Sequence, residues 1–78
     1  MKVTQLQNYM AAINYDQVKN QEVPLETLTL EELRGLLSFE MLSDGMEPED
    51  VQEILDGDNP SYQTTEQIMN ELVEIFGY

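Results

Sequence analysis

The chain has 78 residues, of which sixteen are acidic and three basic, so its formal net charge at pH 7 is −13. It has no cysteine, which excludes a disulfide framework, a thiolate metal site and a cysteine nucleophile. A surface this acidic repels nucleic acid and anionic membrane and attracts basic partners, so direct binding to nucleic acid or membrane is not expected.

The composition predicts one small domain over residues 1–78. Hydrophobic residues make up 41% of the chain and recur at helical spacing, which distinguishes it from a disordered acidic tail. The first residues lack the apolar stretch of a signal peptide, and no apolar run reaches the roughly 18 residues of a membrane span. We therefore expect a cytoplasmic location.

The first helix is predicted over residues 3–14, with Thr4 as its cap. Its apolar stripe consists of Val3, Leu6, Met10 and Ile13. Residues 16–21 favour a short helical turn. Residues 21–28 are predicted to form an extended connector, because Pro24 lacks a backbone N–H and restricts the residue before it.

The next helix is predicted over residues 29–44 and has the clearest start signal. Thr29 and Glu32 have the spacing of a capping box, and Gly45 is a natural stop. Its main stripe is formed by Leu30, Leu33, Leu37 and Met41, widened by Leu36 and Phe39. Because more than half of its circumference is apolar, this helix is expected to be central.

Two further helices complete the prediction. One begins at Pro48, which suits a first helical position, and ends at Gly57. The other begins near Thr64, which has Gln67 three residues later, and ends at Gly77. The expected fold is all-α, a small bundle of four or five short helices without strands. The predicted core comprises Leu33, Leu37, Val51, Ile54, Leu72 and Ile75.

The sequence gives little support for calcium binding, for DNA binding by a helix-turn-helix, or for catalysis. Counting an EF-hand loop from Asp56 places Ser61 where the glycine belongs and Gln67 where the bidentate glutamate belongs, so no calcium site is expected. The helix pair around Gly45 is laid out like a helix-turn-helix, but its second helix is acidic and would be repelled by DNA. Without histidine or cysteine, and with little volume for a cleft, the chain is not expected to be an enzyme or to hold a cofactor.

The acidic run between Glu40 and Asp58 is the main functional candidate. It contains eight carboxylates in nineteen residues: Glu40, Asp44, Glu47, Glu49, Asp50, Glu53, Asp56 and Asp58. A fully helical stretch of that length would carry about one charge per 3.5 Å, close to the roughly 3.4 Å phosphate spacing along one DNA strand. Mimicry of a nucleic-acid backbone is therefore physically possible, and a solvated acidic face that serves solubility alone is the alternative.

Two functions follow as hypotheses. In the first, the acidic residues bind a basic surface, expected on a nucleic-acid-handling protein, with Phe39 and Tyr62 as aromatic anchors. In broad character the chain is similar to the small, acidic, cysteine-free proteins with which bacteriophages occupy the DNA-binding sites of host enzymes, a resemblance of charge and size that transfers no residues. In the second, the protein is a structural or assembly accessory, able to form homo-oligomers, and binds through the apolar side of helix 29–44.

Overall fold

The computed structural model describes residues 1–78 and is built from helices alone, as the sequence predicts. In chain order the elements are η1 (Val3–Gln5), α1 (Leu6–Ala12), α2 (Tyr15–Lys19), η2 (Leu25–Thr27), α3 (Leu30–Ser43), α4 (Pro48–Asp56) and α5 (Thr65–Phe76), where η marks a 3-10 turn. The radius of gyration is 11.3 Å. A folded chain of this length is expected to have about 11.5 Å.

Both predicted capping boxes are present. The Oγ1 of Thr29 accepts a 3.1 Å hydrogen bond from the backbone N–H of Glu32, whose carboxylate accepts a 2.8 Å bond from the N–H of Thr29. Thr64 and Gln67 repeat the arrangement at the start of α5, with both bonds at 3.1 Å. These side chains satisfy N–H groups that the first turn of a helix leaves free, which fixes where α3 and α5 begin.

The N-terminal third differs from the prediction in detail. Thr4 lies inside η1 and caps nothing; the extended residue before this turn is Lys2, at φ −102° and ψ 153°. The first helix ends at Ala12 because Asn14 is left-handed, with φ 57°, and this residue separates α1 from α2. The connector is not fully extended, since η2 tightens it and buries Leu25.

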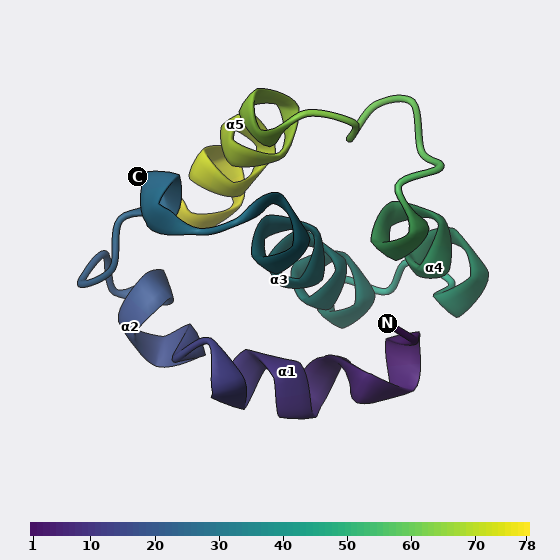
Figure 1. Cartoon of the computed structure of the whole chain (residues 1–78), viewed down its shortest axis with the longest axis horizontal. Helices are drawn as coiled ribbons and strands as arrows, with labels where there is room; N and C mark the ends of the chain where they lie inside the picture. Colours follow the sequence, from purple (N-terminus) through teal and green to yellow (C-terminus); the bar gives the residue numbers. More distant parts are fainter.

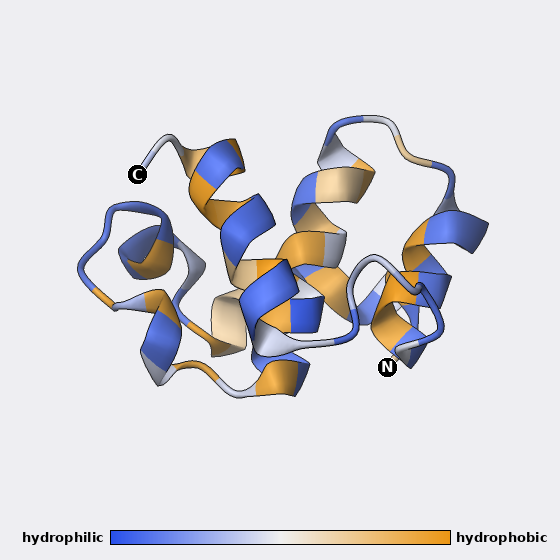
Figure 2. Ribbon diagram, turned by 90° about the horizontal axis from the view of Figure 1, so that it is seen from above, coloured by the Kyte–Doolittle hydropathy of each residue, from blue (hydrophilic) through white to orange (hydrophobic).

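Helix α3 lies at the centre, and α1, α4 and α5 pack against different sides of it (Figure 1). Its middle, residues 35–38, is buried on all sides. On the outer helices the apolar residues form stripes beside hydrophilic ones (Figure 2). The central position predicted for helix 29–44 is therefore confirmed.

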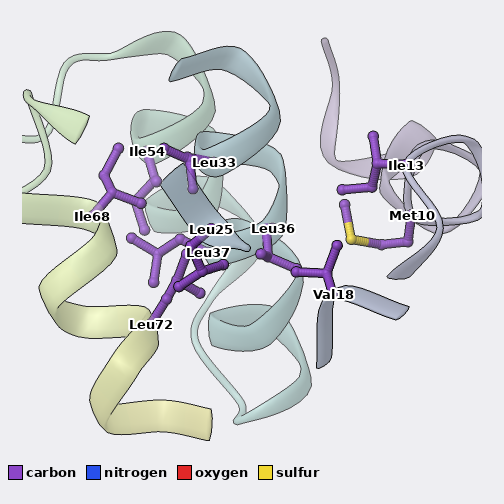
Figure 3. Close-up of a cluster of buried hydrophobic side chains, with 10 residues drawn as sticks. All are labelled: Met10, Ile13, Val18, Leu25, Leu33, Leu36, Leu37, Ile54, Ile68 and Leu72. Atoms are coloured by element: carbon purple, nitrogen blue, oxygen red, sulfur yellow. The ribbon is translucent and has the colours of Figure 1, made fainter. Parts of the chain in front are cut away.

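The core draws on every α-helix (Figure 3). Its main cluster consists of Met10, Ile13, Val18, Leu25, Leu33, Leu36, Leu37, Ile54, Ile68 and Leu72. Five of the six predicted core residues are fully buried, but the prediction for Ile75 is wrong, because its side chain is 38% exposed. The buried row of α5 runs at a spacing of four through Ile68, Leu72 and Phe76. Ile75 is offset by about 100° from Phe76 and falls outside that row.

Candidate protein-binding surface

Helix α4 has one buried and one acidic side. Val51 and Ile54 are completely buried, whereas Glu49, Glu53 and Asp56 are exposed. At 100° per residue these three carboxylates lie within about 60° of one another around the helix axis and span about 10 Å along it. We call Glu49, Glu53 and Asp56 the α4 acidic face.

Four more of the predicted site residues lie on or next to α4 and are also exposed. They are Asp44, just after α3; Glu47, the residue before α4; Asp50, in the first turn of α4; and Asp58, two residues after its end. The acidic run is therefore bent and distributed around the helix. Along the α4 acidic face the carboxylates rise by about 6 Å and then 4.5 Å, which is sparser than the phosphates of one DNA strand.

Glu40 and Phe39 belong to a different side of the molecule. The hydroxyl of Tyr15 donates a hydrogen bond to Glu40, and the rings of Tyr15 and Phe39 meet edge to face with centroids 5.1 Å apart. Burial, followed by the hydrogen bond to Glu40, raises the pKa of Tyr15. Around the axis of α3, Phe39 lies about 140° from Arg34, which faces the end of α4. These two side chains thus join α3 to α2 and do not border the α4 acidic face.

Tyr62, the other predicted anchor, lies in the link between α4 and α5. Its half-buried ring packs against the core, and its hydroxyl donates a long 3.4 Å hydrogen bond to Glu71 of α5. Burial, then the charge of Glu71, raises the pKa of Tyr62. The ring is therefore partly used in holding the link to α5.

The end of α4 is covered by Arg34. Gly57 has a left-handed φ of 77°, and a Cβ there would come within 2.9 Å of the Arg34 Nη2. The guanidinium thus lies beside the C-terminal end of α4, where the backbone carbonyls carry the negative end of the helix dipole. The one arginine of the chain therefore adds a positive charge next to this end of α4.

Gln52 makes a contact that sequence reasoning missed. Its Nε2 donates to the carbonyl of Met1 at 2.9 Å, and its Oε1 accepts from the N–H of Val3 at 3.0 Å. The same Nε2 also donates to Asp56 at 3.0 Å. Lys2, which lies between the two docked backbone groups, is therefore held beside α4. No local pattern signals a contact across about fifty residues.

Two open grooves meet at Lys2. One, of about 460 Å³, is lined by Lys2 together with Glu49 and Gln52. The other, of about 420 Å³, is lined by Lys2 together with Gln52 and Asp56. Lys2 thus borders the same grooves as two residues of the α4 acidic face, Glu49 and Asp56.

Comparison with known proteins adds no identification: no family model, curated protein or solved structure matches the chain.

No group of three or more acidic side chains is placed to hold a metal ion. In the turn after α4, the carbonyls of Gly57 and Asn59 accept hydrogen bonds of 2.8 and 2.7 Å from Gln63. None of the helices combines the length and the apolar character needed to cross a membrane.

Proposed function

We propose that this chain is a small acidic interaction protein that binds a basic surface of a nucleic-acid-handling protein and blocks it. The α4 acidic face carries the proposal. Val51 and Ile54 fix the helix to the core, so Glu49, Glu53 and Asp56 project from a rigid element. Charges held on a rigid helix lose little conformational entropy when a partner binds, so the free-energy cost of binding is small. This favours a role in specific binding over a role in solubility alone.

The proposal includes competition with nucleic acid. A basic cleft that accepts phosphates also attracts carboxylates, and a net charge of −13 steers the protein toward such a cleft. Because the acidic face is sparser than a phosphate backbone, the expected mimicry is of charge and not of phosphate spacing. This mode of action is that of the phage-type inhibitors named above.

The test is affinity capture with two variants of equal charge. The face variant carries Glu49→Gln, Glu53→Gln and Asp56→Asn. The control variant carries Glu66→Gln, Glu74→Gln and Asp16→Asn, which are also exposed but lie on α5 and α2. Glu49 and Glu66 both occupy the second position of a helix, so the two variants lose similar interactions with a helix dipole.

We expect to capture host proteins with the wild type and the control variant but not with the face variant. Added duplex DNA should release these captured proteins. Circular dichroism should show unchanged helix content in both variants. Equal capture by all three proteins would contradict the proposal, as would equal loss in both variants, because net charge alone would then explain binding.

A second function, an assembly accessory, is favoured by apolar exposure on and just after α5. The side chains of Val73, Ile75 and Tyr78 are 39%, 38% and 38% exposed. A groove of about 250 Å³ beside them is lined by Val73, Tyr78 and Pro24, among others. The leucines at the centre of α3 are buried within the fold, so such an interface would use α5. Binding there would change little with salt, whereas binding through the α4 acidic face would weaken steeply.

A further inference from the structure

We infer that Glu49, Gln52 and Asp56 of α4 form a binding site for a peptide segment whose central residue is an extended lysine or arginine, and that residues 1–3 of this chain occupy it in the structure. This inference rests on the proposed function and specifies the partner: a basic segment in extended conformation. Three observations carry it, namely the backbone contacts of Gln52, the position of Lys2 and the orientation of the Gln52 amide.

The Gln52 amide contacts the backbone on both sides of one residue. It donates to the carbonyl before Lys2, at 2.9 Å, and accepts from the N–H after Lys2, at 3.0 Å. Lys2 itself is extended, with φ −102° and ψ 153°. Carbonyl and N–H groups are present in every extended segment, so this contact selects backbone conformation and not the side chains of the flanking residues.

The orientation of the amide is fixed by α4 itself. The Nε2 of Gln52 has two hydrogens, and the second is donated to Asp56 at 3.0 Å, one helical turn further along. The Oε1 therefore points toward the segment. Asp56 acts as a positioning residue for Gln52 and also contributes negative charge to the site.

The side chain between the two contacts is basic and exposed. Lys2 borders one groove with Glu49 and another with Asp56, so both carboxylates line the surface around this residue. A lysine or arginine at the centre of a partner segment would be attracted to these carboxylates, whereas an acidic residue would be repelled. Backbone contact and charge together define the chemistry of the ligand.

Occupation by residues 1–3 makes this segment an internal competitor. Residues 1–3 run directly into η1 and α1, so the chain itself holds this segment beside Gln52 and makes its contact intramolecular. A free peptide must displace it, which lowers the apparent affinity. A change that releases the segment should therefore strengthen the binding of an external peptide.

Val3→Pro is the releasing variant. It removes the N–H that donates to Gln52 Oε1 and so leaves only one of the two backbone contacts, the bond from Gln52 to the Met1 carbonyl. Proline is tolerated at the first position of a helical turn, so η1 should still form. The probe is an acetylated, amidated Met-Lys-Val tripeptide, titrated into labelled protein and followed by NMR. A Met-Gln-Val tripeptide is the neutral control.

We expect the lysine probe to shift the α4 amide signals and the Gln52 side-chain signals, with severalfold tighter binding to Val3→Pro than to the wild type. Adding Gln52→Ala to Val3→Pro should abolish these shifts, and adding Gln17→Ala, an exposed glutamine of α2, should not. No shift in either protein, equal affinity in both, or equal binding of the neutral probe overturns the inference.

The outcome can be separated from that of the proposed function. If partner capture is lost in the face variant but unchanged in Gln52→Ala and Val3→Pro, the proposed function stands and this inference fails. If the peptide binds as expected while the face variant captures partners normally, the peptide site stands and the proposed function fails.

Discussion

Gly35 of α3 lies directly against the ring of Tyr9 of α1: a Cβ at residue 35 would come within 2.7 Å of the Tyr9 Cε2. Glycine inside a helix is unfavourable by about 1 kcal/mol relative to alanine. Here the missing side chain lets the α1 ring approach the backbone of the central helix. The pair explains why a buried helix centre contains a glycine.

We predict that Gly35→Ala destabilises the protein by about 1–3 kcal/mol, because the clash with Tyr9 outweighs the gain in helix propensity. In a Tyr9→Ala background the same substitution should stabilise by up to about 1 kcal/mol, since the obstacle is gone. Chemical denaturation of the four proteins of this cycle measures both effects. A stabilising Gly35→Ala in the wild-type background would show that the ring moves aside freely.

Truncation at two hydrophobic positions should give opposite results. Leu37→Ala should cost about 2–5 kcal/mol, because Leu37 is fully buried in the core. Ile75→Ala should cost less than about 1 kcal/mol, because its side chain is 38% exposed and outside the buried row. Urea unfolding of both variants checks this, and equal losses would mean that the last turn of α5 is packed more closely than described.

Alkaline pH should destabilise the fold through Tyr15. Burial and the bond to Glu40 raise its pKa above the value of about 10 expected in the unfolded chain. A raised folded pKa contributes stability that is fully present below pH 10 and is lost as the pH rises toward the folded pKa. Melting temperatures should therefore fall above pH 10.

The Glu40→Gln variant isolates part of this effect. It keeps a hydrogen-bond acceptor but removes the charge, so the pKa of Tyr15 should fall only partway, because burial is the largest cause and remains. Titration of phenolate absorbance measures the shift. Tyr15→Phe serves as the control, and its absorbance change should lack the latest step. A titration curve that is unchanged in Glu40→Gln, or a Tyr15→Phe curve that loses an early step and keeps the latest one, would exclude this assignment.

Salt should stabilise the protein, because like charges crowd a small surface. With a net charge of −13, screening at moderate ionic strength relieves repulsion that is larger in the folded state. We expect the melting temperature to rise by several degrees between low and moderate sodium chloride, with no added effect of micromolar calcium. A melting temperature that does not change with salt but rises sharply with calcium would support an EF-hand site in the turn after α4.

The features that the sequence predicts well are local. Each capping box joins residues three apart, such as Thr29 and Glu32, so its two partners are visible in one short window. The exposure of Glu49 and Glu53 follows from the buried positions of Val51 and Ile54 on the same helix. The starts of α3, α4 and α5 and the two sides of α4 are therefore predictable, whereas the start of the first helix is not.

The features that the sequence does not reveal depend on how helices meet. The bonds of Gln52 to the first residues span about fifty positions, and nothing in either segment marks the other. Likewise, Phe39 and Glu40 both contact Tyr15 of α2 and lie apart from the α4 acidic face. Periodicity gives the face of a helix but not which neighbour covers it.

Competition with DNA tests whether the α4 acidic face binds a basic, nucleic-acid-handling surface. A captured partner is loaded with labelled duplex DNA, and wild-type, face-variant or control-variant protein is then added. We expect the wild type and the control variant to release the DNA, more weakly at higher salt, and the face variant to leave it bound. A complex that holds this protein and the DNA together, each at full affinity, would contradict the proposal.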